Sequence, residues 1–472
     1  MASIHCSRGL TGPTSSLRLA PRITPIITWA APFSTTPAVD SKVPNAKKPL
    51  QVIGRHIRRG KIAQNSKKKR EIVRIKKPEP GQRKAFRKRI QLSNSNAAAV
   101  TGLPVLEAET MASKENLCRM VGLPDKLVDQ LRALEAFKPT QFWGLFRKPH
   151  MLVRTETVSL MERLNEAATQ KQTLRTVLTG GKNSGKSLML LQAMSHALLN
   201  KWVVINIPEA QDLVNANTEY SPVPNTSPMQ FFQPTYCLSL LQMILKANGE
   251  VLKAYKLSKN YSDLQLIHLP EDGTLYDLAA AAKEAEFAWP VVQALWHELT
   301  AVPGRPPVLL TVDGLSHLMK QSAYRDPSFN IVHAHDLTLV RLLVDALAGH
   351  TPFANGGAVV AGTSRSNAPR SASMELALAQ VAARNAGLED VPAADPYRRD
   401  YDPRVYEAVC NVDVLEVNGI SKLEARAVME YWVASGVLQT TVNEATVTEK
   451  WSIGGHGLLG EMERAALENI RL

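Results

Sequence analysis

Hydrophobic residues along the middle of the chain fall into two alternating patterns. Short apolar runs, typical of strands that are buried on both faces of a parallel sheet, lie at 174–179, 202–208, 308–312 and 356–362. Longer segments with apolar residues at helical spacing lie between them, at 188–199, 237–257, 275–302 and 337–349. Because strands alternate with helices, we expect an α/β core with a mostly parallel sheet from about 174 to 363.

The segments on either side of this core follow other patterns. Residues 122–137 have helical spacing, and Trp143 and Phe146 soon after them are expected to pack under the core rather than to form a docking surface. Residues 221–228, SPVPNTSP, are rich in turn formers and predict an irregular insertion. From residue 412 a C-terminal helical module begins, with Ser421 as N-cap and Glu424 at the capping-box position. A winged helix is one form that this module could take.

A glycine-rich stretch between the first strand and the first helix matches the phosphate-loop pattern G-x-x-x-x-G-K-[ST]. Its residues are Gly180, Gly181, Lys182, Asn183, Ser184, Gly185, Lys186 and Ser187. The glycines let backbone N–H groups turn toward phosphate oxygens, and the following helix adds its positive N-terminus. Lys186 is expected to reach the β- and γ-phosphates, and the Ser187 hydroxyl to bind Mg²⁺. This order of strand, loop and helix predicts a P-loop NTPase core of the AAA or STAND type.

Two further positions are candidate ligands of a bound nucleotide. Asp313 directly follows an apolar run, so it is placed like the Walker-B aspartate that holds Mg²⁺ together with Ser187. Thr363 ends the next apolar run, where its hydroxyl could contact the γ-phosphate, although a plain strand-end turn fits equally well. Gly314 stands where many ATPases carry a glutamate that activates water, so the site favours binding over hydrolysis. No Asn-Lys-x-Asp motif identifies the base, and GTP, GDP and ATP all stay candidates.

Basic charge is concentrated near the N-terminus. The chain of 472 residues has 56 Lys and Arg and 43 Asp and Glu, a formal net charge of +13. Residues 1–40 hold three Arg and one Asp, and residues 41–90 hold 19 Lys and Arg against two Glu, which leaves 34 basic and 40 acidic residues in 91–472. Such a run favours a disordered extension that contacts the phosphate backbone of RNA or another polyanion. Residues 1–39 contain Arg8, Arg18 and Arg22 and no acidic residue. This composition is typical of a mitochondrial transit peptide, with a merely disordered terminus as the alternative.

These patterns divide the chain into five expected parts. They are a transit peptide at 1–39, a basic RNA-contacting extension at 40–95, an N-terminal helical segment at 96–150, a nucleotide-binding domain at 151–370 and the C-terminal helical module at 371–472. No run of 18 apolar residues is present, so we expect no membrane span. The four cysteines are scattered without C-x-x-C or histidine pairing, and they predict neither a disulfide framework nor a zinc site.

Five segments, taken in order, resemble a known family. They are LRALEAFKPTQFWGLFRKPHMLVR, GGKNSGKS, INIPEAQDLV, VLLTVDGL and EKWSIGGHGLLGEMERAAL. Together they are similar to the death-associated protein three family, the nucleotide-binding protein of the mitochondrial ribosome's small subunit. The resemblance implies a place in the mitochondrial matrix, in the head of the small subunit, with small-subunit rRNA and ribosomal proteins as partners. It also implies a bound guanine nucleotide and admits a bridge to the large subunit.

Two classes of function therefore compete. The leading interpretation is a structural ribosomal component that holds a nucleotide, with slow hydrolysis at most. The alternative is an active P-loop ATPase, or a nucleotide-dependent switch, that remodels nucleic acid or protein in mitochondria. Gly314 and the pairing of a transit peptide with a basic extension favour the structural component.

Overall fold

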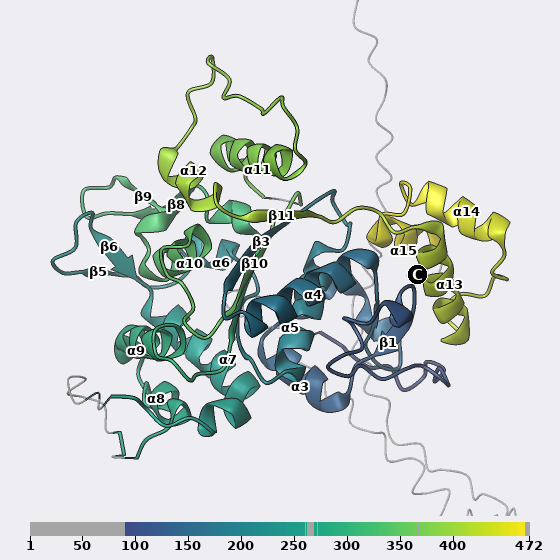
Figure 1. The fold of residues 1–472 in the computed structure, drawn as a ribbon, viewed down its shortest axis with the longest axis horizontal. Helices are drawn as coiled ribbons and strands as arrows, with labels where there is room; N and C mark the ends of the chain where they lie inside the picture. Colours follow the sequence, from purple (N-terminus) through teal and green to yellow (C-terminus); the bar gives the residue numbers. More distant parts are fainter. Residues whose placement is uncertain (1–89, 260, 262–268, 271, 367, 468–472) are drawn as a thin grey trace, which may run out of the picture. The chain divides into compact units, whose positions relative to one another are not determined.

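The apolar runs of the sequence form a five-stranded sheet in the structure, a computed structural model that describes residues 90–472 except 260, 262–268, 271, 367 and 468–472 (Figure 1). Its strands are β3 (Thr173–Thr179), β4 (Val203–Ile207), β7 (Val308–Asp313), β10 (Gly357–Gly362) and β11 (Asp413–Glu416). They lie in the order β11-β3-β10-β7-β4, and every neighbouring pair is parallel. The expected α/β fold with a mostly parallel sheet is confirmed.

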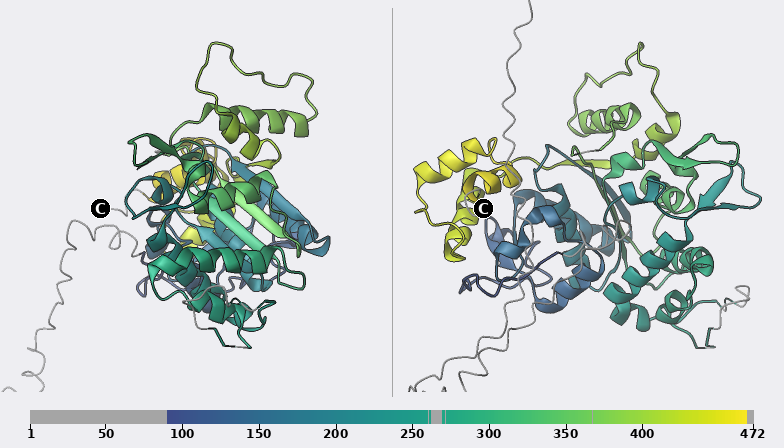
Figure 2. Two further views of the ribbon diagram at one scale, coloured as in Figure 1. Left: turned by 90° about the vertical axis from the view of Figure 1, so that its left-hand side faces the viewer. Right: turned by 180° about the vertical axis from the view of Figure 1, so that it is seen from behind.

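Helices cover both faces of this sheet (Figures 1 and 2). One layer consists of α3 (Asp125–Ala133), α4 (Thr155–Thr169) and α5 (Lys186–Leu199), and the other of α7 (Pro234–Lys253), α9 (Ala288–Thr300) and α10 (Thr338–Ala348). Successive strand residues pack into different layers: Leu309 belongs to the core of the first, and Leu310 to the core of the second. Because both faces are buried, the strands read as unbroken apolar runs rather than as alternating ones.

Among the described residues, three small antiparallel two-stranded sheets were not expected from the sequence. They pair β1 (Met120–Gly122) with β2 (His150–Leu152), β5 (Ser221–Val223) with β6 (Gln230–Phe232), and β8 (Gln321–Arg325) with β9 (Ile331–His333). The first lies in the segment expected to be helical, and the second closes the turn-rich insertion. Most of these strands have only three residues, so they are too short to show a period in the sequence.

The C-terminal part of the chain is helical after β11. Its helices are α13 (Lys422–Ala434), α14 (Glu444–Ile453) and α15 (Leu459–Leu467), and the capping box of Ser421 and Glu424 begins α13 as expected. They share a core with Met120, Phe146 and Leu152 from the N-terminal segment. Trp143 and Phe146 are buried, so the expectation that they pack inside is confirmed. Within residues 422–467 the structure contains no strand, and nothing there supports a winged helix.

The remaining α-helices of the described residues pack on the core of the second layer. They are α6 (Gln211–Val214), α8 (Leu275–Ala280), α11 (Ala372–Asn385) and α12 (Pro403–Val409). Among the described residues, no helix is both long enough and apolar enough to cross a membrane. The expected transit peptide at 1–39 and most of the basic extension at 40–95 lie outside the described residues.

Candidate nucleotide site

The phosphate loop connects β3 to α5 and has glycine where the backbone turns. Gly180 has a φ of 132° and Gly185 a φ of 103°, in the region that glycine adopts most readily. Lys186 begins α5 and turns its ammonium back over the loop, where it donates hydrogen bonds to the carbonyls of Gly180 at 3.1 Å and Gly181 at 2.5 Å. Two carbonyls of the loop therefore hold the Lys186 ammonium over it.

Asp313 is the last residue of β7, and β10 separates that strand from the strand that carries the loop. Ser187 Oγ donates a hydrogen bond to Asp313 Oδ2 at 2.7 Å, so the two residues expected to bind Mg²⁺ are adjacent. Gly362 pairs with Asp313 in the sheet, and a Cβ at Gly362 would lie 3.4 Å from Asp313 Oδ1. Thr363 lies beside them, but its hydroxyl donates to the carbonyl of Leu178 at 3.0 Å. The Thr363 hydroxyl thus fixes the end of the strand.

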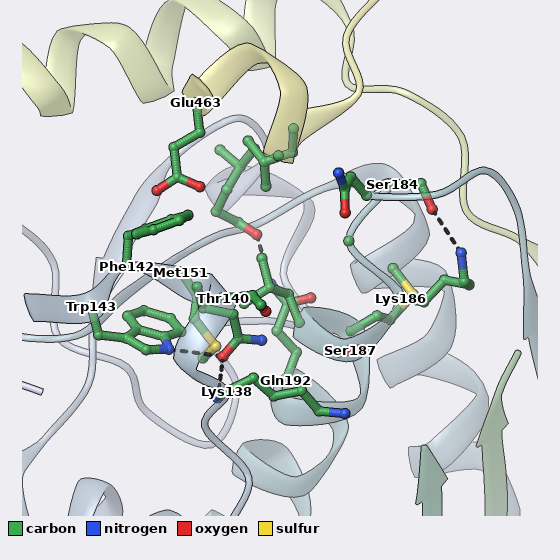
Figure 3. A pocket seen from close by; sticks show the side chains of 18 of the residues that line it. Lys138, Thr140, Phe142, Trp143, Met151, Ser184, Lys186, Ser187, Gln192 and Glu463 are labelled. Carbon is green, nitrogen blue, oxygen red and sulfur yellow. Dashed lines mark hydrogen bonds between the residues drawn. The ribbon is translucent and has the colours of Figure 1, made fainter. Parts of the chain in front are cut away.

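A cavity of about 450 Å³ lies over the loop (Figure 3). Residues 182–187, Asp313 and Thr363 line it, so the structure brings these candidates together around one space. Gly180 and Gly181 shape the loop without lining the cavity. In Figure 3, Phe142 and Glu463 lie across the cavity from Ser184 and Lys186. The cavity thus has a polar side formed by the loop and a side formed by the N-terminal segment and α15.

Four cations that line the cavity were not singled out from the sequence. They are Lys138, Arg154, Arg365 and Arg464. Burial lowers the pKa of Lys186, and the charge of Arg365, which follows β10 closely, lowers it further against the opposing attraction of Asp313. A basic residue shortly after a strand that ends at the site would have been a usable signal for Arg365. Lys138 and Arg154 precede the loop in regions without a recognisable motif, and only the fold brings them to it.

The C-terminal part of the chain packs directly on the phosphate loop. The carbonyl of Val417, just after β11, lies so close to Gly180 that a Cβ at Gly180 would overlap it. Arg154 bridges the two regions, because it donates to the carbonyl of Ser184 in the loop at 3.3 Å and to that of Asn418 at 2.9 Å. The loop conformation and the position of this C-terminal segment therefore depend on each other.

Helix α15 makes a second contact with the loop. Asn183 Nδ2 donates to Glu461 Oε1 at 2.5 Å, and the backbone N–H of Gly460 donates to the carbonyl of Asn183 at 3.2 Å. A Cβ at Gly460 would lie 3.0 Å from the Cβ of Asn183, so this close approach favours glycine. The first turn of α15 is thus fitted to one residue of the phosphate loop.

The five parallel strands, with helices on both faces, define a protein of the α/β class, and its loop between β3 and α5 has the sequence pattern of a phosphate loop. Comparison with known proteins gives the family. The model of the mitochondrial ribosomal death-associated protein 3 family matches residues 151–465, and the chain belongs to that family. The resemblance inferred from the sequence is confirmed, and with it the location in the mitochondrial ribosome, in the matrix.

Individual relatives agree with this membership. The small ribosomal subunit protein mS29 of Neurospora crassa is 50% identical over 408 residues, which cover 86% of each chain. The protein of the same name from Schizosaccharomyces pombe is 26% identical over 329 residues, or 68% of this chain and 65% of that protein. A closed-state structure of Hsp104 with ATPγS and FITC casein covers 73% of this chain and 47% of its own, at 9% identity and a TM-score of 0.29. That similarity is too weak to bear on function.

Proposed function

We propose that this protein is a structural component of the small subunit of the mitochondrial ribosome and holds a purine nucleotide in the phosphate loop. Its relatives are small ribosomal subunit proteins, and half of the aligned residues are shared with the Neurospora crassa protein. The proposed nucleotide is GTP or GDP, which the family resemblance implies. ATP stays a candidate, because the sequence has no Asn-Lys-x-Asp motif that selects guanine. Small-subunit rRNA and neighbouring ribosomal proteins are the proposed partners, with a bridge to the large subunit as a further contact.

One observation carries the nucleotide part of this proposal: the phosphate loop lies between the sheet and the C-terminal helices and contacts both. Asn183 bonds to α15, and Arg154 links Ser184 to the segment before α13. A ligand that binds only the folded protein stabilises it by RT ln(1 + [L]/Kd), about 4 kcal/mol at a thousandfold excess over Kd. Nucleotide at this position would therefore stabilise the loop together with the helices that pack on it.

The groups around the loop favour retention over turnover. Gly314 supplies no carboxylate to activate water, and the Thr363 hydroxyl is engaged by the backbone of β3. Lys186, Arg365 and the N-terminus of α5 supply positive charge for the phosphates. A Mg²⁺ ion held by Ser187 and Asp313 would have to share the Asp313 carboxylate with Lys138, which forms an ion pair with it.

The test compares Lys186 with a lysine outside the cavity. Lys186 is buried at the loop, whereas Lys148 is exposed and does not line the cavity, so Lys186→Ala should abolish co-purifying nucleotide while Lys148→Ala retains it. Released nucleotide is identified by chromatography after denaturation. Equal occupancy in both variants would remove the phosphate-loop assignment. Single-turnover hydrolysis of γ-labelled GTP and ATP tests the structural role, and rates of order 1 s⁻¹ would favour the ATPase or switch instead.

A further inference from the structure

Lys138 places its ammonium group beside Asp313, where a magnesium ion would bind in this site. Its ammonium forms an ion pair with Asp313 Oδ2, the same oxygen that accepts the hydrogen bond from Ser187. It also donates to the carbonyl of Pro208, just beyond β4, at 3.1 Å. The carboxylate of Asp313 is largely buried, with 10% of its side chain exposed, so a cation beside it is well shielded from water.

The backbone of Lys138 is held in position by its own segment. Its N–H donates to Gln141 Oε1 at 2.8 Å, and the same oxygen accepts from Trp143 Nε1 at 2.8 Å. Trp143 is buried and packs edge-on against Phe137 with ring centroids 5.5 Å apart. These contacts fix the backbone on both sides of Lys138, so its side chain extends into the site from a well-held segment.

The surroundings of Asp313 do not fit a resident Mg²⁺ well. Magnesium needs near-octahedral oxygen ligands at close range, and a carboxylate that already pairs with an ammonium offers it less charge. On the side of the cavity formed by the phosphate loop, the described lining residues include the cations Lys138, Lys186 and Arg365. The carboxylate on that side is that of Asp313. This excess of fixed positive charge suits the phosphates of a nucleotide without an added divalent ion.

We propose that Lys138 supplies from the chain itself the positive charge that Mg²⁺ would supply, so that this protein retains its nucleotide without magnesium. The inference rests on the proposed nucleotide binding and deepens it. Lys138 is thus a positioning residue that neutralises Asp313 and faces the phosphate side of the cavity. It also explains how a nucleotide could stay bound as a structural ligand when free magnesium changes.

The test measures the affinity of the full chain for mant-GDP by fluorescence, in excess MgCl₂ and in excess EDTA. The parent should bind with nearly equal affinity in both buffers. Lys138→Met removes the charge but keeps most of the side-chain volume, and its affinity in EDTA should fall roughly 10- to 100-fold, the usual effect of removing one charged partner, with part of the affinity restored by MgCl₂. Lys138→Arg keeps a charge and should keep most of the EDTA affinity.

Lys148→Met is the matched control, because Lys148 lies in the same segment and forms an exposed ion pair with Asp125. Thermal unfolding of each variant without nucleotide shows whether it is folded, and Lys138→Arg still decides the question should Lys138→Met unfold. A parent that loses affinity tenfold or more in EDTA would overturn the inference while leaving nucleotide binding intact. Equal behaviour of Lys138→Met and Lys148→Met would do the same. No binding in either buffer would remove the proposed function and this inference with it.

Discussion

Gly180→Ala is the most informative single change in the phosphate loop, because Gly180 packs against the C-terminal segment and does not line the cavity. At Gly180 the φ of 132° is one that alanine rarely adopts, and an added Cβ would overlap the carbonyl of Val417. The next residue, Gly181, has no such constraint, since a Cβ there would meet only Leu458, at 3.5 Å. Gly181→Ala is therefore a control one position away.

The expected loss of stability has two sources. Forcing alanine into a glycine-favoured conformation costs about 1–3 kcal/mol. Moving the Val417 carbonyl away also strains the hydrogen bond from the Val417 N–H to the carbonyl of Thr179, 2.8 Å long, and such a bond contributes about 1 kcal/mol. Together these effects predict a loss of about 2–4 kcal/mol for Gly180→Ala, and less than about 1 kcal/mol for Gly181→Ala.

Thermal unfolding and urea unfolding of both variants without added nucleotide measure this difference. At about 2–4 °C per kcal/mol for domains of moderate size, Gly180→Ala should lower Tm by about 5 °C or more. Limited proteolysis should also cut the C-terminal helices of Gly180→Ala faster than those of the control, because their packing on the loop is weakened. Equal Tm values for the two variants would refute the dependence of the loop on the C-terminal segment.

Three other predictions concern charge and protonation. Burial lowers the pKa of His150 to about 3, whereas the same side chain in the unfolded chain has a pKa of about 6.5. As the pH falls, the unfolded chain therefore binds a proton at His150 before the folded chain does. The contribution of His150 to the free energy of unfolding is fully present above about pH 6.5 and is lost as the pH drops below it. His150→Phe should remove up to about 1.4 kcal/mol of that loss per pH unit, measured as urea unfolding at pH 7 and pH 5. Deleting residues 42–89 should reduce the slope of log affinity for RNA against log salt by about 0.7–0.9 for each phosphate that the segment neutralises, and an unchanged slope would show that this segment does not touch RNA. Gly314→Glu should increase the slow hydrolysis of GTP in single-turnover assays, and an unchanged rate would mean that a carboxylate there does not activate water.

Sequence patterns predicted the elements of the fold that are defined by residues close together in the chain. The loop sequence, the buried strand before it and the aspartate at the end of β7 follow from spacing and apolar runs, and the structure places Ser187 of the loop beside Asp313. β11 was missed because it has only four residues and lies in a segment with helical periodicity on its C-terminal side. A strand this short is defined by its partner β3 and not by its own composition.

The site was harder to predict than the fold because its contacts join distant segments. Lys138 lies in a stretch whose aromatic residues suggested packing, and no spacing rule connects it with Asp313. The contacts of Asn183 with α15 depend on how the C-terminal helices fold back over the loop. The sequence showed that the segment at 453–460 is rich in glycine, but the close approach that requires Gly460 is visible only in three dimensions.

The pairing of β11 with β3 has a consequence for the order in which the protein is made. Because synthesis runs from the N-terminus, β3 and the phosphate loop are made well before Asp413–Glu416 and Val417. Until those residues are made, one edge of β3 has no partner strand and Gly180 lacks the Val417 carbonyl that packs against it. A shorter nascent chain therefore contains the complete phosphate-loop motif without the contacts that hold its shape. Nucleotide capture should accordingly be a late event that marks a finished chain.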